Sequence, residues 1–449
     1  MRFLSSLVVS IVVLVAAAAP ARSQTASPTA PAAADNRRLT AEESDAAIAE
    51  IERLVGEHYF EASKRPAVLA ALAEGRRSGR YRGTTAVDFV RLVTEDLRRT
   101  SNDRHMYLTW NPQGYRVLLE RARAPATGAR DDSYFQERFR RENHGLQEMK
   151  ILPGNVRYLK IAAWLWDETE TPAAYDQAMK FLSGGDAVIL DLRGNGGGFA
   201  EPGEYLVSHF VPPGVLLHTS VYAKESDPAF SAQTLPAGRM IGKPLYVLID
   251  KASASATEAV ALHVDRFKLG ELIGETTSGA GNRNTWYPVA PGFRLSLSVG
   301  SVRHGLDGSG WEAVGVAPHV KVEPKSALEL ARVRALEELA QSGLESRRGE
   351  YRWHAETAQA AFDPPKLTPE QLARYPGRYG EMTVALRDGQ LFRQRPGQPD
   401  LPLRPVQADT FLVGTAEDTR LRFDSEGGRI VSATLLTRVG VLDTLRRAP

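Results

Sequence analysis

Residues 187–199 read AVILDLRGNGGGF, and this stretch decides the fold. Its first half is an unbroken apolar run, which is typical of a strand buried on both faces of a sheet. The three consecutive glycines that follow let the backbone turn sharply and direct its N–H groups outward. They form either a tight turn between a strand and a helix or a cradle for a negatively charged oxygen. They are not a phosphate loop, because no Lys-Ser or Lys-Thr pair follows them.

On either side of this stretch, strand-like and helix-like patterns alternate. Residues 155–164 (NVRYLKIAAW) and 244–250 (PLYVLID) are strand-like, and residues 293–304 (FRLSLSVGSVRH) alternate with period two. Residues 326–343 (SALELARVRALEELAQSG) are expected to form a closing helix. Alternating strands and helices predict an α/β domain, which we place at residues 105–342.

The residues before this domain show a helical pattern. Residues 40–43 (TAEE) match a capping box, with Thr40 as the N-cap and Glu43 as the third helical residue. Apolar residues then recur at helical spacing in three successive segments. We therefore expect an N-terminal helical domain at residues 40–104.

The residues after the α/β domain change in character. Residues 343–367 are polar and poorly periodic, which predicts a linker. Residues 383–393 (TVALRDGQLFR) and 420–436 (RLRFDSEGGRIVSATLL) each predict a hairpin, with an Asp-Gly and a Gly-Gly turn. We therefore expect an all-β module at residues 368–449.

The first residues have the pattern of a secretory signal peptide. Arg2 supplies a positive charge, and the apolar run that follows is too short to span a bilayer comfortably. Small residues at both cleavage-site positions place the cut after Ser23, which gives a signal peptide at residues 1–23 and a flexible segment at residues 24–39. No other stretch predicts a membrane span. We expect an exported protein, periplasmic by default or else secreted.

Composition excludes several classes of function. The 449 residues include no cysteine, which excludes disulfides, a cysteine nucleophile and thiolate metal sites. The formal net charge of +2 gives no reason to expect nucleic acid as a partner. The nine histidines form no HExxH or similar pair, so we expect no metal and no cofactor. A homo-oligomer is compatible with this composition.

The stretch KASASATEA, residues 251–259, places hydroxyls at alternate positions between a predicted strand and a predicted helix. A serine at such a turn has its hydroxyl near the positive end of the helix dipole. The N–H of the next residue can then stabilise a developing negative charge. The alternative is that a serine or threonine here simply caps the helix.

Four ordered motifs resemble a known family: AVILDLRGNGGG, YVLIDKASASATEA, LGELIGETTSGAGN and GWEAVGVAPHVKV. The sequence is similar to the tail-specific, or carboxyl-terminal processing, serine proteases. Within them it looks closest to the branch that contains tricorn protease and the interphotoreceptor retinoid-binding protein modules. The resemblance implies a crotonase-like α/β core.

The resemblance implies which residues would carry the chemistry. The nucleophile of the family is the serine three positions before the glutamate, which is Ser255 here. The expected oxyanion donors are the N–H groups of Ala256 and of a glycine in the GGG turn. Gly197 is favoured, with Gly196 and Gly198 as close alternatives.

The expected general base also follows from the resemblance. Processing proteases use a lysine 25 positions after the serine, but this position is Ala280, which cannot accept a proton. The tricorn-like branch instead uses a histidine from the N-terminal region, and the match is His105. The glutamate that supports it in that branch maps to Glu312, with Asp103 as a rival. A structural role for His105 in a strand is the alternative.

Two functions therefore stand side by side. The first is an exported serine peptidase that acts on peptide or polypeptide substrates through Ser255 and His105. The second is a non-catalytic binding module for a peptide or an apolar ligand, as in the retinoid-binding relatives. Only about 30 residues between Trp110 and Glu142 are unassigned, so we expect no PDZ domain for capturing substrate tails.

Overall fold

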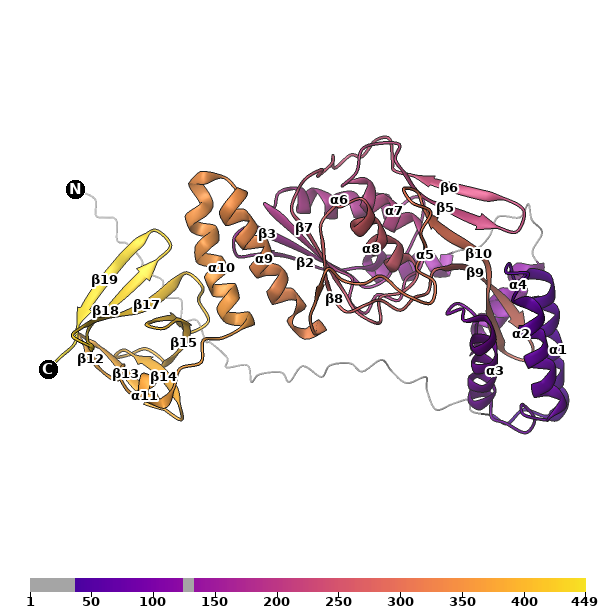
Figure 1. Ribbon diagram of the computed structural model, residues 1–449, viewed down its shortest axis with the longest axis horizontal. Helices are drawn as coiled ribbons and strands as arrows, with labels where there is room; N and C mark the ends of the chain where they lie inside the picture. The colour runs from indigo at the N-terminus through magenta and orange to yellow at the C-terminus, as the bar shows by residue number, and fades with distance from the viewer. Residues whose placement is uncertain (1–36, 124–132) are drawn as a thin grey trace, which may run out of the picture.

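The computed structural model describes residues 37–123 and 133–449. The molecule is elongated, with the N-terminal helices at one end, a six-stranded sheet in the middle and the C-terminal strands at the other end (Figure 1). The predicted signal peptide and residues 24–36 lie outside the described residues. Leu39, which the sequence predicts to be flexible, is instead buried and donates its N–H to the carbonyl of Thr84. No helix in the described ranges is long and apolar enough to cross a membrane.

Three helices form the N-terminal region: α1 (Ala41–His58), α2 (Arg65–Arg77) and α3 (Ala86–Ser101). The predicted capping box of α1 is confirmed, because Thr40 Oγ1 accepts the N–H of Glu43 and the Glu43 carboxylate accepts the N–H of Thr40. The apolar faces of the helices share one hydrophobic core with strands β9 (Asn282–Val289) and β10 (Phe293–His304). This shared core fixes the helices against the sheet that contains β10.

A six-stranded sheet forms the centre of the molecule. Its strands lie in the order β11 (Val320–Lys321), β8 (Glu271–Gly274), β7 (Leu245–Ile249), β4 (Ala187–Asp191), β3 (Val156–Ile161) and β2 (Leu146–Leu152). Neighbouring strands are parallel except β2 and β3. Every residue of β4 and β7 is buried, as their apolar runs predict. Since β4 and β7 are parallel neighbours, the turns that follow them meet at one edge of the sheet.

Helices cover both faces of this sheet. One face packs against α6 (Thr171–Ser183), α7 (Glu201–Ser208) and α8 (Ala256–Arg266), and the other packs against α9 (Ala327–Ser342), the predicted closing helix. The predicted linker at residues 343–367 is wrong in part, because it contains helix α10 (Arg348–Phe362), which lies against α9 (Figure 1). The buried side of α10 is small or polar, so it shows no aliphatic periodicity in the sequence. It consists of Tyr351, His354, Ala355, Thr357, Ala358 and Ala360.

A second sheet joins the N-terminal region to the core. It pairs β1 (Tyr107–Trp110), β10, β5 (Leu216–Tyr222) and β6 (Ser226–Phe230) in that order, with β9 also on β10. Strand β1 runs antiparallel to β10, with Tyr107 opposite Ser296. Helices α4 (Pro112–Arg123) and α5 (Ser133–Arg141) follow β1 along the chain. The residue just before β1 is therefore held at a fixed register against the core.

The C-terminal residues contain the short helix α11 (Pro369–Leu372) and an eight-stranded antiparallel sheet. The predicted hairpins are present as β13–β14 and β17–β18. A bridge between Tyr379 and Arg447 brings the first strand to the end of the last. The strands are β12 (Gly377–Tyr379), β13 (Met382–Arg387), β14 (Gln390–Gln394), β15 (Leu401–Gln407), β16 (Thr410–Val413), β17 (Thr419–Glu426), β18 (Arg429–Thr437) and β19 (Gly440–Arg446).

Candidate active site

Ser255 lies in a strained turn between β7 and α8. Its backbone has φ 57° and ψ −120°, a conformation that residues with a side chain rarely adopt. Such strain persists only where the surroundings enforce it. The turn presents the Ser255 hydroxyl at the N-terminus of α8, whose first residue is Ala256.

Glu258 is the group that enforces this turn. Its fully buried carboxylate accepts the backbone N–H of Ser255 at 2.9 Å. It also accepts the N–H groups of Gly279 and Ala280 at 2.6 and 2.8 Å and the hydroxyl of Thr277. Burial raises the pKa of Glu258, and these hydrogen bonds oppose that shift. The carboxylate therefore ties the serine turn to residues 277–280 of the neighbouring loop.

His105 comes to the same place from the N-terminal region. It follows Asn102, which ends α3 in the left-handed conformation, and it precedes β1. The N–H of His105 donates to Asp103, and its carbonyl accepts the hydroxyl of Ser296 on β10. These contacts bring His105 Nε2 to 3.2 Å from Ser255 Oγ. The two side chains are thus within hydrogen-bonding reach across 150 positions of sequence.

The surroundings of His105 favour the neutral imidazole. Its side chain is buried, and this desolvation, assisted by the positive charge of Arg98, lowers the pKa of His105 to about 4. A neutral ring can accept a proton at Nε2 only when its own proton is on Nδ1. The ring of His105 is therefore neutral, and able to accept a proton, near neutral pH.

Glu312 and Asp103 lie beside His105 without a direct hydrogen bond to its ring. Glu312 Oε1 accepts the N–H of Arg104 at 2.8 Å, and its other oxygen accepts the N–H groups of Gly281 and Asn282. Asp103 accepts the side-chain amide of Asn282 at 2.9 Å. Burial, together with the negative charge of Asp103, raises the pKa of Glu312 to about 7. Glu312 thus fixes the segment that carries His105 and sits one step from the ring.

The glycine turn after β4 packs directly against Ser255. A Cβ atom on Gly197 would lie 2.7 Å from Ser255 Cβ, so only glycine fits there. The N–H of Gly197 donates to the Asn195 side chain at 3.0 Å and is therefore engaged, in contrast to the free donor that the resemblance implies. Within the described ranges, the N–H groups of Gly198 and Ala256 have no acceptor. These two donors, rather than Gly197, are available for an oxyanion.

Ala280 stands where the resemblance places a lysine in the processing proteases. It is buried, and its carbonyl accepts the indole N–H of Trp311 at 3.0 Å. Lys251 is an exposed residue that lies 3.6 Å from Glu275, and Lys268 lies at the far end of α8 beside Asp265. Neither lysine contacts Ser255 in the described structure. His105 is the base that this geometry offers.

A small pocket of about 40 Å³ opens beside Ser255. Its walls are mostly small or apolar, and its polar groups are His218, Asn282 and Arg283. Gly198 and Ala256 line the pocket with the nucleophile, whereas Gly197 does not. The remaining lining residues are Ala200, Ala259, Ala280, Gly281, Val302 and Trp311.

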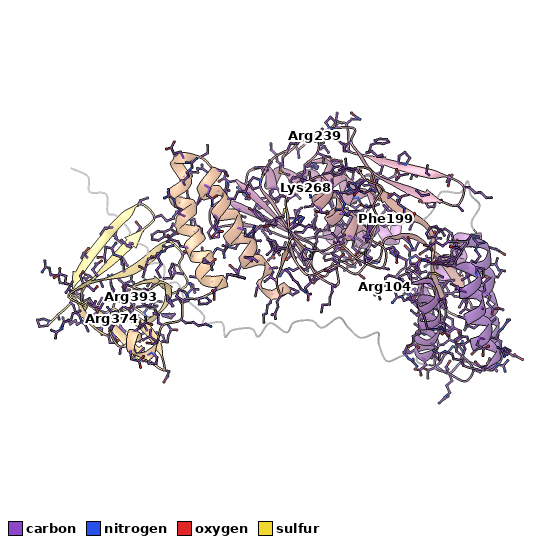
Figure 2. The ribbon with its side chains drawn as sticks, viewed as in Figure 1. Arg104, Phe199, Arg239, Lys268, Arg374 and Arg393 are labelled. Carbon is purple, nitrogen blue, oxygen red and sulfur yellow. The ribbon has the colours of Figure 1, made fainter. Side chains whose placement is uncertain are left out.

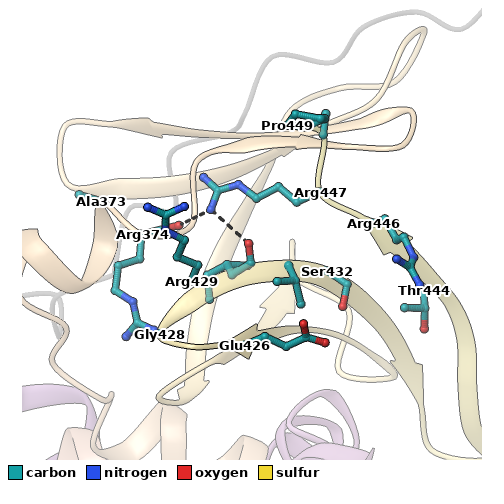
Figure 3. Close-up of a pocket in the computed structure, with 13 residues that line it drawn as sticks. Ala373, Arg374, Glu426, Gly428, Arg429, Ser432, Thr444, Arg446, Arg447 and Pro449 are labelled. Carbon is teal, nitrogen blue, oxygen red and sulfur yellow. Dashed lines mark hydrogen bonds between the residues drawn. The ribbon is translucent and has the colours of Figure 1, made fainter.

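A larger pocket, of about 810 Å³, lies in the C-terminal sheet (Figure 3). Arg447 lines this pocket and donates hydrogen bonds to the carbonyls of Arg374, Pro376 and Ile430. Its guanidinium is therefore engaged in stabilising the C-terminal strands. Arg374 lies beside the C-terminal strands near one end of the molecule, far from Arg104 beside the N-terminal helices (Figure 2). This pocket therefore takes no part in the arrangement around Ser255.

Two functional contributors escaped the sequence analysis. Glu258 anchors the serine turn, and the spacing S-x-x-E of a capping box could have indicated it. Asn195 joins the two turns: its carbonyl accepts the N–H of Ala254 and the hydroxyl of Thr257, while its side chain accepts the N–H of Gly197. No local pattern marks Asn195, because Ala254 and Thr257, the partners by which it joins the two turns, lie about 60 residues away.

Residues 155–322 match the model of peptidase family S41. Peptidase family S41 is thus what this segment is similar to. The matched segment contains Ser255, the glycine turn and Glu312, whereas His105 lies before it.

The chain is also similar to known processing proteases over part of its length. The chain is 32% identical to the carboxy-terminal processing protease CtpA of Bacillus subtilis, over 31% of this chain and 29% of that protein. It is 29% identical to a chloroplastic C-terminal processing peptidase of Tetradesmus obliquus, over 37% of this chain and 35% of that protein. The matches thus span about a third of the length of these relatives. Among solved structures, the photosystem II D1 C-terminal processing protease has a TM-score of 0.42 and 17% identity, over 65% of this chain and 97% of that one.

Proposed function

We propose that this protein is a serine peptidase that hydrolyses peptide bonds with Ser255 as nucleophile and His105 as general base. The observation that carries the proposal is the 3.2 Å approach of His105 Nε2 to Ser255 Oγ at a strained turn. His105 takes the proton of Ser255 as Oγ attacks the peptide carbonyl carbon. The same proton then passes to the leaving amine as the C–N bond breaks, and water hydrolyses the acyl-serine by the reverse transfer.

The negative oxygen of the tetrahedral intermediate would be held by the N–H groups of Ala256 and Gly198. Gly197 would join them only after releasing Asn195. Glu312 would act as a positioning residue for His105, since it holds the neighbouring Arg104 N–H and its negative charge favours the imidazolium form.

The wider assignments are part of this proposal. We place the chain in the tricorn-like branch, without a PDZ domain, because Ala280 replaces the lysine and His105 supplies a base. The core is crotonase-like, with an N-terminal helical domain at residues 40–104 and a C-terminal all-β module at residues 368–449. A signal peptide at residues 1–23 exports the protein to the periplasm or beyond. The substrates are polypeptides or peptides.

The alternative, a non-catalytic binder on the same fold, receives less support. A binder needs neither the 3.2 Å contact nor the two free N–H donors beside Ser255. The pocket of about 40 Å³ is also far smaller than the ~300–1,000 Å³ typical of sites for apolar ligands of drug size.

Labelling with a fluorophosphonate probe tests the proposal. Wild-type protein should react, whereas Ser255→Ala should not, and His105→Ala should react at least 100-fold more slowly. All three proteins should show the same circular dichroism spectrum. Labelling of Ser255→Ala at the wild-type rate, in protein purified from a host lacking related proteases, would overturn the proposal.

A further inference from the structure

Three side chains of different elements converge behind the nucleophile. Asp103, His105 and Glu312 each place one oxygen or nitrogen within 4.8 Å of the others. Asp103 and His105 are buried, whereas Glu312 is partly exposed. Imidazole nitrogen and carboxylate oxygen are both ligands that zinc accepts in proteins.

The imidazole offers an unused nitrogen to this cluster. His105 Nε2 is within hydrogen-bonding reach of Ser255, which leaves Nδ1 as the ring nitrogen free for a ligand beside the two acids. Nδ1 is buried and has no hydrogen-bond partner in the described structure, and the whole residue is only 6% exposed. A buried ring nitrogen without a partner is costly unless something binds it.

The two carboxylates are already held as metal ligands usually are. Backbone N–H groups fix both oxygens of Glu312, and the N–H of His105 and the amide of Asn282 fix Asp103. Glu312 Oε1 and both oxygens of Asp103 accept one hydrogen bond each and keep a second lone pair for a cation, whereas Glu312 Oε2 already accepts two. Burial, and after it the negative charge of Asp103, raises the pKa of Glu312, and a bound cation would relieve the repulsion between the two acids.

We propose that Asp103, His105 and Glu312 form an inhibitory site for a divalent transition-metal cation of the zinc type. The metal binds His105 Nδ1 and one oxygen from each acid, and water fills the remaining position. Donor atoms around tetrahedral zinc lie about 3.3–3.6 Å apart, so donor atoms that start within 4.8 Å of one another need to close in by no more than about 1.5 Å on binding. Mg²⁺ and Ca²⁺ prefer sites made only of oxygen and would bind weakly. The partly exposed Glu312 gives the cation its route of entry.

Inhibition follows from the tautomer of the imidazole and rests on the proposed function. A metal on Nδ1 leaves the ring proton on Nε2. Nε2 then can only donate to Ser255 Oγ and cannot take its proton. The cation therefore switches off the base without touching the nucleophile, and removing the cation restores it.

Calorimetric titration of Ser255→Ala protein with ZnCl₂ tests the site without requiring activity. We expect one Zn²⁺ per chain, with affinity at least 10-fold weaker in Ser255→Ala proteins that also carry Glu312→Gln or Asp103→Asn. Glu275→Gln, an acid outside the cluster, is the matched control and should keep the affinity. Equal zinc affinity in all of these proteins, or tighter binding of Mg²⁺ than of Zn²⁺, would overturn the site.

Fluorophosphonate labelling of wild-type protein tests the inhibition separately. Saturating Zn²⁺ should slow labelling at least 20-fold, and EDTA should restore the rate. Zinc binding at the cluster with no change in labelling rate overturns the inhibitory role. Absent labelling with zinc binding intact would instead count against the proposed peptidase function while the metal site stands.

Discussion

The carboxylate of Glu258 accepts the backbone N–H of Ser255 at 2.9 Å. Glu258 lies about one helical turn after the serine whose backbone it fixes. The same carboxylate accepts the N–H of Ala280 at 2.8 Å, in the loop where the processing proteases carry a lysine. The nucleophile and this loop are therefore held by one buried acid. Loss of the Glu258 carboxylate should therefore disturb both the position of Ser255 and this loop.

Glu258→Gln should destabilise the protein and impair the active site. The amide keeps the size of the side chain but places an NH₂ group against N–H donors, which leaves buried groups unsatisfied. We expect the free energy of unfolding to fall by about 2–4 kcal/mol, measured by urea denaturation. Labelling of Ser255 should slow at least 10-fold. Glu275→Gln, which removes only an exposed contact with Lys251, should change stability by less than about 1 kcal/mol; equal effects would contradict this role for Glu258.

Gly197→Ala should abolish labelling of Ser255. The new Cβ would meet Ser255 Cβ at 2.7 Å and the Ala254 carbonyl at 2.8 Å, and the residue has φ 101°. The serine must move or the turn must open. Gly196→Ala is the matched control, because its Cβ meets no atom within 4 Å. Labelling rates of the two variants, compared with circular dichroism spectra, decide the point: a fully active Gly197→Ala protein would refute the packing argument.

The acid limb of activity should lie well below the usual pKa of histidine. Because burial and Arg98 lower the pKa of His105 to about 4, the base stays neutral down to that pH. The limb in kcat/KM for a peptide substrate should therefore appear near pH 4 and not near about 6.5. Arg98→Gln removes the positive charge that helps to lower the pKa of His105, so the acid limb should move to higher pH. A limb near pH 6.5 in the wild-type protein would show that His105 is more hydrated than this structure indicates.

Glu312 should make stability depend on pH between about 4.5 and 7. Its pKa is raised to about 7 from a reference value of 4.5, so the folded state holds a proton that the unfolded state releases. This contribution is complete below pH 4.5 and is lost as the pH rises through 7. As the pH rises from 5 to 8, the unfolding free energy of the wild type should therefore fall relative to that of Glu312→Gln. A constant difference over that range would contradict the raised pKa.

Substrates with a small residue before the cleaved bond should be preferred. The pocket beside Ser255 measures about 40 Å³ and is walled by Ala280, Val302 and Trp311, which leaves room for one or two methyl groups. Peptides with alanine at this position should be cleaved at least 100-fold faster, in kcat/KM, than those with phenylalanine. Fluorogenic peptide pairs that differ only there provide the measurement, and equal rates would exclude this pocket as the specificity site.

Much of the central fold could be predicted because its signals are local. The apolar runs of β4 and β7 are buried throughout, and β10 spans the same residues as the alternating segment at 293–304. Helix α10 was mistaken for a linker because its buried side carries Ala355, Ala358 and His354, which have no aliphatic signature.

The candidate site was harder, because its members depend on long-range contacts. The pairing of His105 with Ser255 came from a family resemblance, since no spacing rule joins residues 150 positions apart. The choice among Gly196, Gly197 and Gly198 depended on Asn195, whose side chain occupies the N–H of Gly197. Such competition between two acceptors for one donor is visible only in three dimensions.

The distance along the chain between His105 and Ser255 also sets when activity can arise. The segment bearing His105 is positioned by β10 and by Glu312, so both must be synthesised and folded before the base meets the nucleophile. Contacts of such long range form late, because the chain must first close a large loop. In a nascent or unfolded chain His105 is therefore not yet held against Ser255, and the proposed peptidase activity should stay off until folding is complete.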